Sequence, residues 1–380
     1  MGPLKGIKVV ELAGIGPGPL VAMFLADLGA TVIRIDRKEP SGLGIPRPIE
    51  YDLGLRNRKS IRVDLKDPAG VEAVLKLVES ADALIEGFRP GVTERLGLGP
   101  DMCHARNKKL VYGRVTGWGQ DGPLAQSAGH DINYIAITGV LNAIGRKGHA
   151  PTVPLNLIGD FAGGSLYLAM GMLAALLEAR TSGEGQVVDA AIVDGVALLM
   201  TPMIGMRAAG MVNPERGSNV LDSGAPFYDV YECADGKFVS IGPIETKFYT
   251  QLLQRLELDS PALRDQMNRQ FWDEARAAFA SRFKSRPLAD WTAMFDGTDM
   301  CVAPVLEVEE AFEHPHLAAR GTFIEVAGLK QPAPGPRFSR TSLATPTPPA
   351  AFSEANTFAA LNDWLPESEV RALMAAGAVH

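Results

Sequence analysis

The sequence predicts an α/β protein with an open, doubly wound parallel sheet and a second, smaller α+β domain. The first observation is a strand pattern at residues 6–12, a helical pattern at 20–28 and another strand pattern at 31–36, which together make a βαβ unit. The second is the length of 380 residues, which exceeds what one hydrophobic core usually supports. The third is a strong hairpin turn signal at Asp235-Gly236, far from the βαβ region.

The first half of the chain continues this pattern. Further strands are expected at residues 60–64, 83–85, 110–115 and 186–191, with a helix at 69–80. Alternation of strands and helices favours a parallel sheet covered on both faces.

The second half changes character. A small-residue, Met-rich helix should run toward Met211 with an interruption at Pro202, followed by a hairpin over residues 228–241. Helices are expected at 247–256, 272–283 and 288–295, and, after a proline-rich crossing at 331–349, at 355–365 and 367–375. We therefore expect a large domain from residues 1–190 and 326–380, a helical linker at 191–220 and a small domain at 221–325.

Composition excludes several classes of function. A net charge of −7 and the lack of a basic run interleaved with aromatic residues argue against nucleic-acid binding. Cys103, Cys233 and Cys301 form no Cys-x-x-Cys motif, which favours reduced thiols in the cytoplasm over disulfides or a zinc site. The apolar stretch 165–177 is shorter than a membrane span, so we expect a buried helix and no membrane insertion.

A glycine-rich turn, Gly14-Ile15-Gly16-Pro17-Gly18, separates the first strand from the first helix. Its backbone N–H groups could receive an anion or a developing oxyanion. The dinucleotide fingerprint requires another glycine where Pro19 or Val21 stands, so Asp36 at the next strand end only imitates a ribose-binding acid. A simple tight turn explains the cluster equally well.

Two titratable residues, His130 and Asp160, are candidates for a catalytic role. His130 lies in a polar, glycine-rich segment after the strand at 110–115, where open α/β sheets bind ligands. Asp160 stands just before the apolar stretch, where an acid also complements a helix dipole. Position alone leaves a structural role open for both.

Seven segments together resemble the α-methylacyl-CoA racemases of the class III CoA-transferase superfamily. They are residues 11–18, 27–30, 56–59, 86–91, 129–134, 185–189 and 315–321. The resemblance implies an enzyme that interconverts (R)- and (S)-2-methylacyl-CoA, with His130 and Asp160 as the two acid/base groups on opposite faces of the α carbon. It also implies that Glu245 supports the histidine and Asn156 supports Asp160, although Glu245 is equally explained as an ordinary polar residue.

The resemblance further implies how the substrate is held. The backbone N–H of Asp131 and the turn at Gly16 would stabilise the enolate oxygen. The residues that would bind CoA are Arg37, Arg56, Val63, Asp64, Leu65, Lys66, Gly87, Phe88, Arg89, Arg95, Gly129, Ile132, Asn133 and Tyr134, with one or two of the arginines expected to be merely solvated. The region from Met200 to Met211 could carry the acyl chain, although core packing explains it more simply.

Partners and alternatives follow from the same resemblance. It implies an interlocked homodimer, a CoA thioester as substrate, and neither a metal nor a redox cofactor. Bile-acid precursors, branched fatty acids and sterol side chains all present the same α-methyl thioester. A CoA-transferase in which Asp160 attacks the thioester is the alternative enzyme, and a non-catalytic CoA-binding protein is the alternative of another class.

Overall fold

A computed structural model of the chain describes residues 2–39 and 42–380. Its main sheet has six strands in the order β3-β2-β1-β4-β5-β6, and every neighbouring pair is parallel. The strands are β1 (Lys8–Leu12), β2 (Thr31–Arg37), β3 (Lys59–Val63), β4 (Ala83–Glu86), β5 (Val111–Thr116) and β6 (Val187–Ala191). The predicted open parallel sheet is confirmed.

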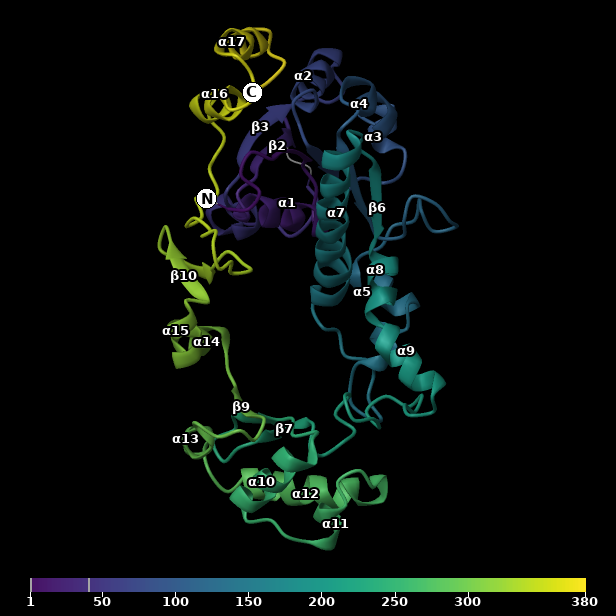
Figure 1. Ribbon diagram of the computed structural model, residues 1–380, viewed down its shortest axis with the longest axis vertical. Helices are drawn as coiled ribbons and strands as arrows, with labels where there is room; N and C mark the ends of the chain where they lie inside the picture. Colours follow the sequence, from purple (N-terminus) through teal and green to yellow (C-terminus); the bar gives the residue numbers. More distant parts are fainter. Residues whose placement is uncertain (1, 40–41) are drawn as a thin grey trace. The chain divides into compact units, whose positions relative to one another are not determined.

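Helices cover both faces of this sheet (Figure 1). Helices α1 (Pro17–Asp27) and α7 (Tyr167–Ser182) pack on one face. The other face is covered by four helices that share one core with alternate strand residues such as Val10 and Leu12: α2 (Pro68–Val78), α4 (Pro100–Arg106), α16 (Glu354–Asn362) and α17 (Glu367–Ala375). The sheet is therefore doubly wound. Its strand order reverses between β1 and β4, where folds of this kind bind ligands beyond the carboxyl ends of the strands.

The predicted helix at 165–177 is present, but it is part of a longer helical segment and is buried on one face only. The structure has a π-helix, η3 (Leu157–Leu166), continuous with α7, so the helical segment runs for 26 residues. One face of α7 packs on β5 and β6, whereas Leu166, Met170 and Leu177 are 55%, 57% and 67% exposed. Among the described residues this is one helix long and apolar enough to cross a membrane by length and composition, a test that core helices also pass.

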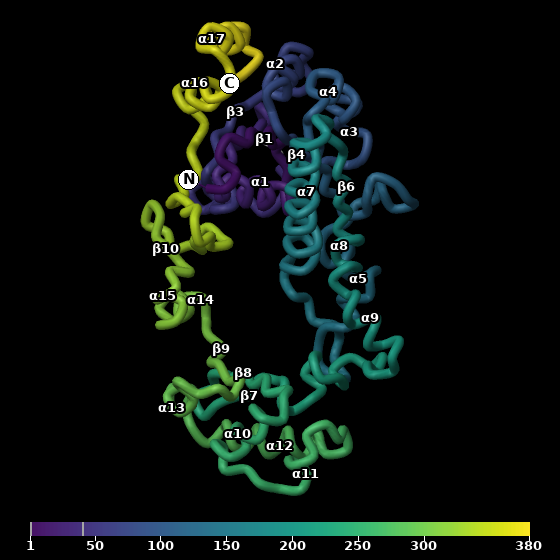
Figure 2. Tube along the Cα trace, viewed as in Figure 1, coloured from purple at the N-terminus to yellow at the C-terminus, as the bar shows by residue number. Residues whose placement is uncertain are grey.

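The C-terminal residues, from β10 onward, belong to the same unit as the six-stranded sheet. The hairpin of β10 (Phe323–Val326) and β11 (Leu329–Pro332) leads into an extended stretch, and α16 then packs on β3. Figure 2 shows this C-terminal segment running back beside the amino-terminal strands. The backbones of Arg62 and His380 exchange hydrogen bonds of 2.8 and 2.9 Å, so the last residue is joined to the sheet.

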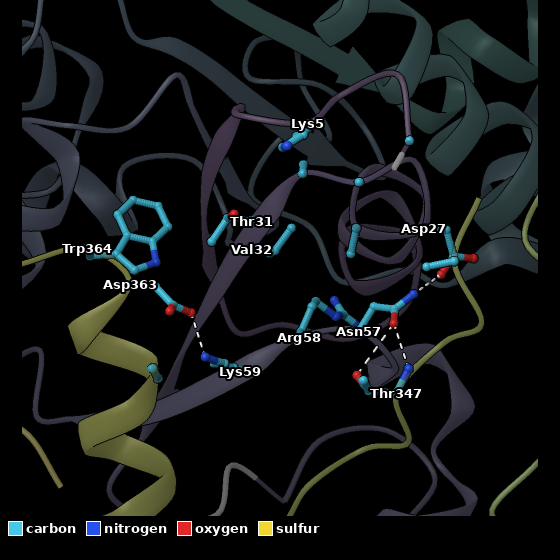
Figure 3. A pocket seen from close by; sticks show the side chains of 16 residues that line it. Lys5, Asp27, Thr31, Val32, Asn57, Arg58, Lys59, Thr347, Asp363 and Trp364 are labelled. Carbon is cyan, nitrogen blue, oxygen red and sulfur yellow. Dashed lines mark hydrogen bonds and ion pairs between the residues drawn. The ribbon is translucent and has the colours of Figure 1, made fainter. Parts of the chain in front are cut away.

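Residues of the C-terminal segment, together with residues at the amino ends of β2 and β3, line a hollow of about 420 Å³ (Figure 3). In this hollow the side-chain amide of Asn57 joins the end of α1 to the C-terminal segment. Its Nδ2 donates to Asp27 at 2.7 Å, and its Oδ1 accepts from the N–H of Thr347 at 2.8 Å. Lys59 pairs with Asp363 at 2.6 Å. These interactions fasten the C-terminal segment at the sheet end opposite to the switch point.

A second unit contains the predicted hairpin. β7 (Asp229–Glu232) and β8 (Phe238–Ile241) pair antiparallel, and β9 (Val302–Val305) adds to β8. Helices α10 (Thr246–Leu256), α12 (Trp272–Phe283) and α13 (Leu288–Phe295) close an aromatic core against this sheet. The smaller α+β domain is confirmed as a fold class.

The contacts divide the chain into two compact units. The first comprises Met1–Thr138, Leu155–Leu199 and Gly321–His380, and the second Gly139–Pro154 and Met200–Arg320. The helix expected to be interrupted near Pro202 is two helices, α8 (Ile192–Leu199) and α9 (Thr201–Ala208), with the proline in the first turn of α9. The predicted limits of domains and linker at residues 190, 220 and 325 stay predictions.

Candidate active site

The candidate site lies beyond the carboxyl end of β5, where the chain loops out and returns as α5 (Asp131–Ile137). His130 is the residue that precedes the first helical turn, in an extended conformation, and its side chain is exposed. Its backbone N–H donates to Oδ1 of Asn133 at 3.1 Å, which fixes the main chain where the helix begins.

Asp160 lies in the first turn of η3, and its side chain is half-buried. Oδ2 accepts a hydrogen bond from Nδ2 of Asn156 at 3.2 Å, so the predicted pairing of these two residues is present in the structure. A π-helix is rare and is frequently found at functional sites.

The surroundings raise the pKa of the Asp160 carboxyl. Burial is the largest cause, the hydrogen bond from Asn156 opposes it, the negative charge of Asp131 raises the pKa further, and the charge of protonated His130 lowers it. Asp160 therefore holds a proton more readily than an ordinary aspartate, as an acid at a proton-transfer site requires. His130 and Asp160 belong to one site because Asp131, which directly follows His130, accepts the N–H of Asp160 at 2.8 Å.

The glycine-rich turn lies beside the same carboxylate. A Cβ built on Gly16, whose φ is 68°, would lie 3.5 Å from Oδ2 of Asp160. Buried Ser165 joins the turn to the π-helix, since its hydroxyl lies 3.0 Å from both the Pro17 and the Asp160 carbonyl oxygens. The absence of a side chain at Gly16 therefore keeps space open beside Asp160.

Tyr134 forms the wall behind the start of α5. Its hydroxyl donates to the Gly129 carbonyl, and its ring meets Trp118 edge-on with the centroids 4.7 Å apart. Burial, with the charge of Asp160 as a further cause, raises the pKa of Tyr134 to about 12, so the hydroxyl remains a donor near neutral pH. Cβ atoms at Gly117 and Gly129 would lie 2.1 and 2.7 Å from this ring, which explains the glycines on either side of it.

A hollow of about 270 Å³ lies at the switch point of the sheet. The predicted CoA-binding residues Arg37, Gly87 and Phe88 line it, and the Arg37 guanidinium lies 5.8 Å from the centre of the Phe88 ring. Asp36 is not arranged like a ribose-binding acid, because its carboxylate accepts a hydrogen bond from Nε of Arg34 at 2.8 Å.

The structure does not bring Arg56 to this hollow. Its side chain is only 4% exposed, and it bonds Asp27 at 2.5 Å, Oε1 of Gln331 at 2.9 Å and the carbonyl of Pro332 at 2.7 Å. The geometry favours a structural role over the predicted CoA contact.

The other predicted residues are distributed along the first unit. Val63 is buried, Leu65 packs against the core below β3, and Asp64 and Lys66 are exposed. Arg89, Arg95, Ile132 and Asn133 are exposed at or near the carboxyl side of the sheet. Glu245 is an exposed residue at the start of α10 in the second unit. The functional roles of these residues stay predictions.

Sequence reasoning missed two features of the site. Arg62 and Phe352 line the switch-point hollow, with the guanidinium 4.1 Å from the ring centre, although they are 290 residues apart in sequence. The carboxylate of Asp131, considered only for its backbone N–H, accepts a hydrogen bond from the N–H of Asp160 at 2.8 Å. No group of three or more metal-ligating side chains is arranged around a common point in the part of the chain that the structure describes.

Comparisons with known proteins match most of the chain. The model of CoA-transferase family III matches residues 4–357. Alpha-methylacyl-CoA racemase of Mus musculus is 44% identical over 339 residues, covering 89% of this chain and 87% of the mouse protein, and the protein of the same name from Homo sapiens is 45% identical over 323 residues, covering 84% and 82%. A CAIB/BAIF family protein from Brucella suis superposes with a TM-score of 0.80 at 26% identity, covering 97% of this chain and 99% of that one.

Proposed function

Because this chain belongs to CoA-transferase family III and is 44–45% identical to two alpha-methylacyl-CoA racemases, we propose that it is a 2-methylacyl-CoA racemase. The reaction interconverts the (R) and (S) thioesters by moving one proton off and one proton onto the α carbon. The geometric observation that supports it is that Asp131, the residue directly after His130, accepts the N–H of Asp160 at 2.8 Å, so both acid/base candidates belong to one site.

The reaction needs two acid/base groups, because inversion removes a proton from one face and delivers another to the opposite face. In one direction neutral His130 takes the α proton while protonated Asp160 supplies the new one. In the other direction ionised Asp160 takes the proton and charged His130 supplies one. Both starting states hold one proton in total, so each turnover prepares the pair for the reverse reaction.

The intermediate is an enolate whose oxygen carries the negative charge. The first turn of α5 presents the backbone N–H of Asp131 at a helix start, and the turn at Gly16 offers further backbone beside Asp160. Donors fixed in this way stabilise charge that develops during the reaction. The chemistry is proton transfer alone, and the proposal includes neither a metal nor a redox cofactor.

The switch-point hollow supports CoA as the carrier of the acyl group. Arg37 can meet a phosphate by charge-assisted hydrogen bonds, and Phe88 offers a face for stacking. We place the phosphate and adenine portions of the CoA near these residues, with the thioester toward Asp160.

Incubation of one enantiomer of a 2-methylacyl-CoA in heavy water tests the function. Racemisation together with deuterium at the α carbon is the expected result. His130→Ala and Asp160→Asn should each abolish inversion while CoA still binds. Retained optical purity and no deuterium would contradict the proposal.

A CoA-transferase is the second candidate, because the family description itself names that activity. Asp160 would then attack the thioester carbonyl, release the CoA thiolate and form a mixed anhydride. Transfer of CoA to an added free acid without α deuteration would favour this alternative.

We further propose a homodimer that works in the cytoplasm. The exposed Leu166, Met170 and Leu177 on the helix through α7 are apolar surface that a second copy would cover. Cys103, Cys233 and Cys301 are all free thiols, as a reducing compartment would maintain them. Light scattering of the purified protein tests the dimer, which a monomer mass would contradict.

A further inference from the structure

Asp131 has two separate links to the candidate site. Its backbone begins α5 directly after His130, and its carboxylate, which is buried, accepts the backbone N–H of Asp160 through Oδ2 at 2.8 Å. The bond joins residues 29 positions apart. It therefore connects the helix start next to His130 with the π-helix that carries Asp160.

The structure makes room for this bond at Gly159. A Cβ there would lie 2.3 Å from Oδ2 of Asp131 and 2.7 Å from its Cγ, distances at which the carboxylate must move. The turn at 159–160 therefore approaches Asp131 more closely than any side-chain-bearing residue permits. The glycine requirement comes from this contact and not from a positive φ.

The second oxygen of the carboxylate carries an additional signal. Oδ1 of Asp131 is buried and has no hydrogen-bond partner among the residues that the structure describes. A buried carboxylate oxygen without a partner is costly, and a catalytic role is one of the reasons for which such a group is retained. The negative charge also raises the pKa of Asp160.

We propose that the Asp131 carboxylate is a positioning residue that sets the separation and orientation of His130 and Asp160 across the α carbon. The inference rests on the proposed racemase function and extends it. A two-base reaction depends on this separation more than substrate binding does, because both groups must reach opposite faces of one carbon. A displacement of about 1 Å can lower a rate by roughly 100-fold.

Three variants separate positioning from charge and from folding. Asp131→Ala removes the hydrogen bond to the N–H of Asp160. Asp131→Asn keeps an acceptor oxygen and should largely preserve both this hydrogen bond and the activity. Gly159→Ala should displace the Asp131 carboxylate without changing the chemistry of residue 131. Asp82→Ala is a matched control, since Asp82 also ties distant segments by accepting the N–H of Lys8 at 2.7 Å, but at the amino ends of β1 and β4.

The kinetic readout is the ratio of exchange to inversion in heavy water. Asp131→Ala should lower kcat roughly 100-fold with little change in KM. Deuterium should then accumulate in the enantiomer that was supplied, because the intermediate returns to it more often than it inverts. Gly159→Ala should do the same, and the double variant should be no worse than either single variant. A lost fold would instead reduce exchange and inversion in proportion.

Hydrogen exchange of the Asp160 amide tests the bond without any substrate. Protection should be lost in Asp131→Ala and kept in Asp131→Asn and Asp82→Ala. An unchanged exchange-to-inversion ratio in Asp131→Ala, or in Gly159→Ala should the first variant not fold, would overturn the proposal, as would an Asp160 amide that stays protected. If the native enzyme neither exchanges nor inverts 2-methylacyl-CoA while amide protection behaves as expected, the racemase assignment fails instead.

Discussion

Nδ2 of Asn156, the residue that precedes η3, lies 3.2 Å from Oδ2 of Asp160 and donates a hydrogen bond to it. Burial raises the pKa of this Asp160 carboxyl. The hydrogen bond favours the ionised form, so it limits how far burial can raise the pKa. The two residues together set how readily this group passes between acid and base.

Asn156→Ala should raise the pKa of Asp160 further. The acidic limb of the kcat/KM profile for racemisation should therefore move to higher pH, because the doubly protonated pair persists to higher pH. Asn268→Ala is the matched control, since Nδ2 of Asn268 donates to Asp265 at 3.0 Å in the second unit. An acidic limb that stays in place in Asn156→Ala would contradict the prediction.

Asp160→Asn should stabilise the protein near neutral pH. The raised pKa means that the folded-state contribution of Asp160 is fully present below the ordinary pKa of an aspartate and is lost as pH rises through the raised value. Asparagine avoids ionising a buried carboxyl, so its stability gain over the native protein should be present at about pH 7 and shrink toward about pH 4. Urea unfolding at both pH values measures it.

Asp259→Asn supplies a control of opposite sign. The hydrogen bond and charge of Arg264 lower the pKa of Asp259, whose contribution is present above the ordinary aspartate pKa and lost as pH falls through the lowered value. This variant should lose stability near neutral pH and approach the native protein in acid. A gain for Asp160→Asn that does not depend on pH would contradict the electrostatic explanation.

Arg56→Ala should destabilise the fold by about 3–5 kcal/mol, because it leaves the buried Asp27 carboxylate with its main partner removed. Urea unfolding measures the loss. Arg264→Ala, at an exposed pair with Asp259, should have a much smaller effect. A variant at Arg56 that keeps its stability but has a higher KM for acyl-CoA would restore the CoA-binding role predicted from sequence.

Arg37→Ala should raise the KM for acyl-CoA roughly tenfold, through the loss of a charge-assisted contact to phosphate, while kcat stays near the native value. The native KM should rise with salt, and this dependence should weaken in the variant. Lys38→Ala removes the adjacent exposed cation and should change neither. Equal effects of the two substitutions would indicate a general electrostatic attraction of acyl-CoA and would contradict a specific contact between Arg37 and phosphate.

Local pattern was sufficient for most elements. The βαβ unit at the start and the hairpin around Asp235-Gly236 form as expected, because apolar periodicity and turn chemistry are local properties. The bounds of α12 and α17 agree with the expected ranges for the same reason. The helix at 157–182 is longer and less fully buried than expected, because helix length and the choice of buried face depend on what packs against it.

The sequence by itself determined the family, the doubly wound sheet class and the pair His130 and Asp160 as candidates, since these follow from motifs and from residue chemistry. Only the tertiary structure decided how those residues are supported. It pairs Arg56 with Asp27 and brings Arg62 and Phe352 together in the switch-point hollow. It also lets the Asp131 carboxylate bind the turn at Gly159. The reason is physical. Burial and hydrogen bonding between distant segments fix the pKa and position of a side chain, and neither is encoded in its near neighbours along the chain.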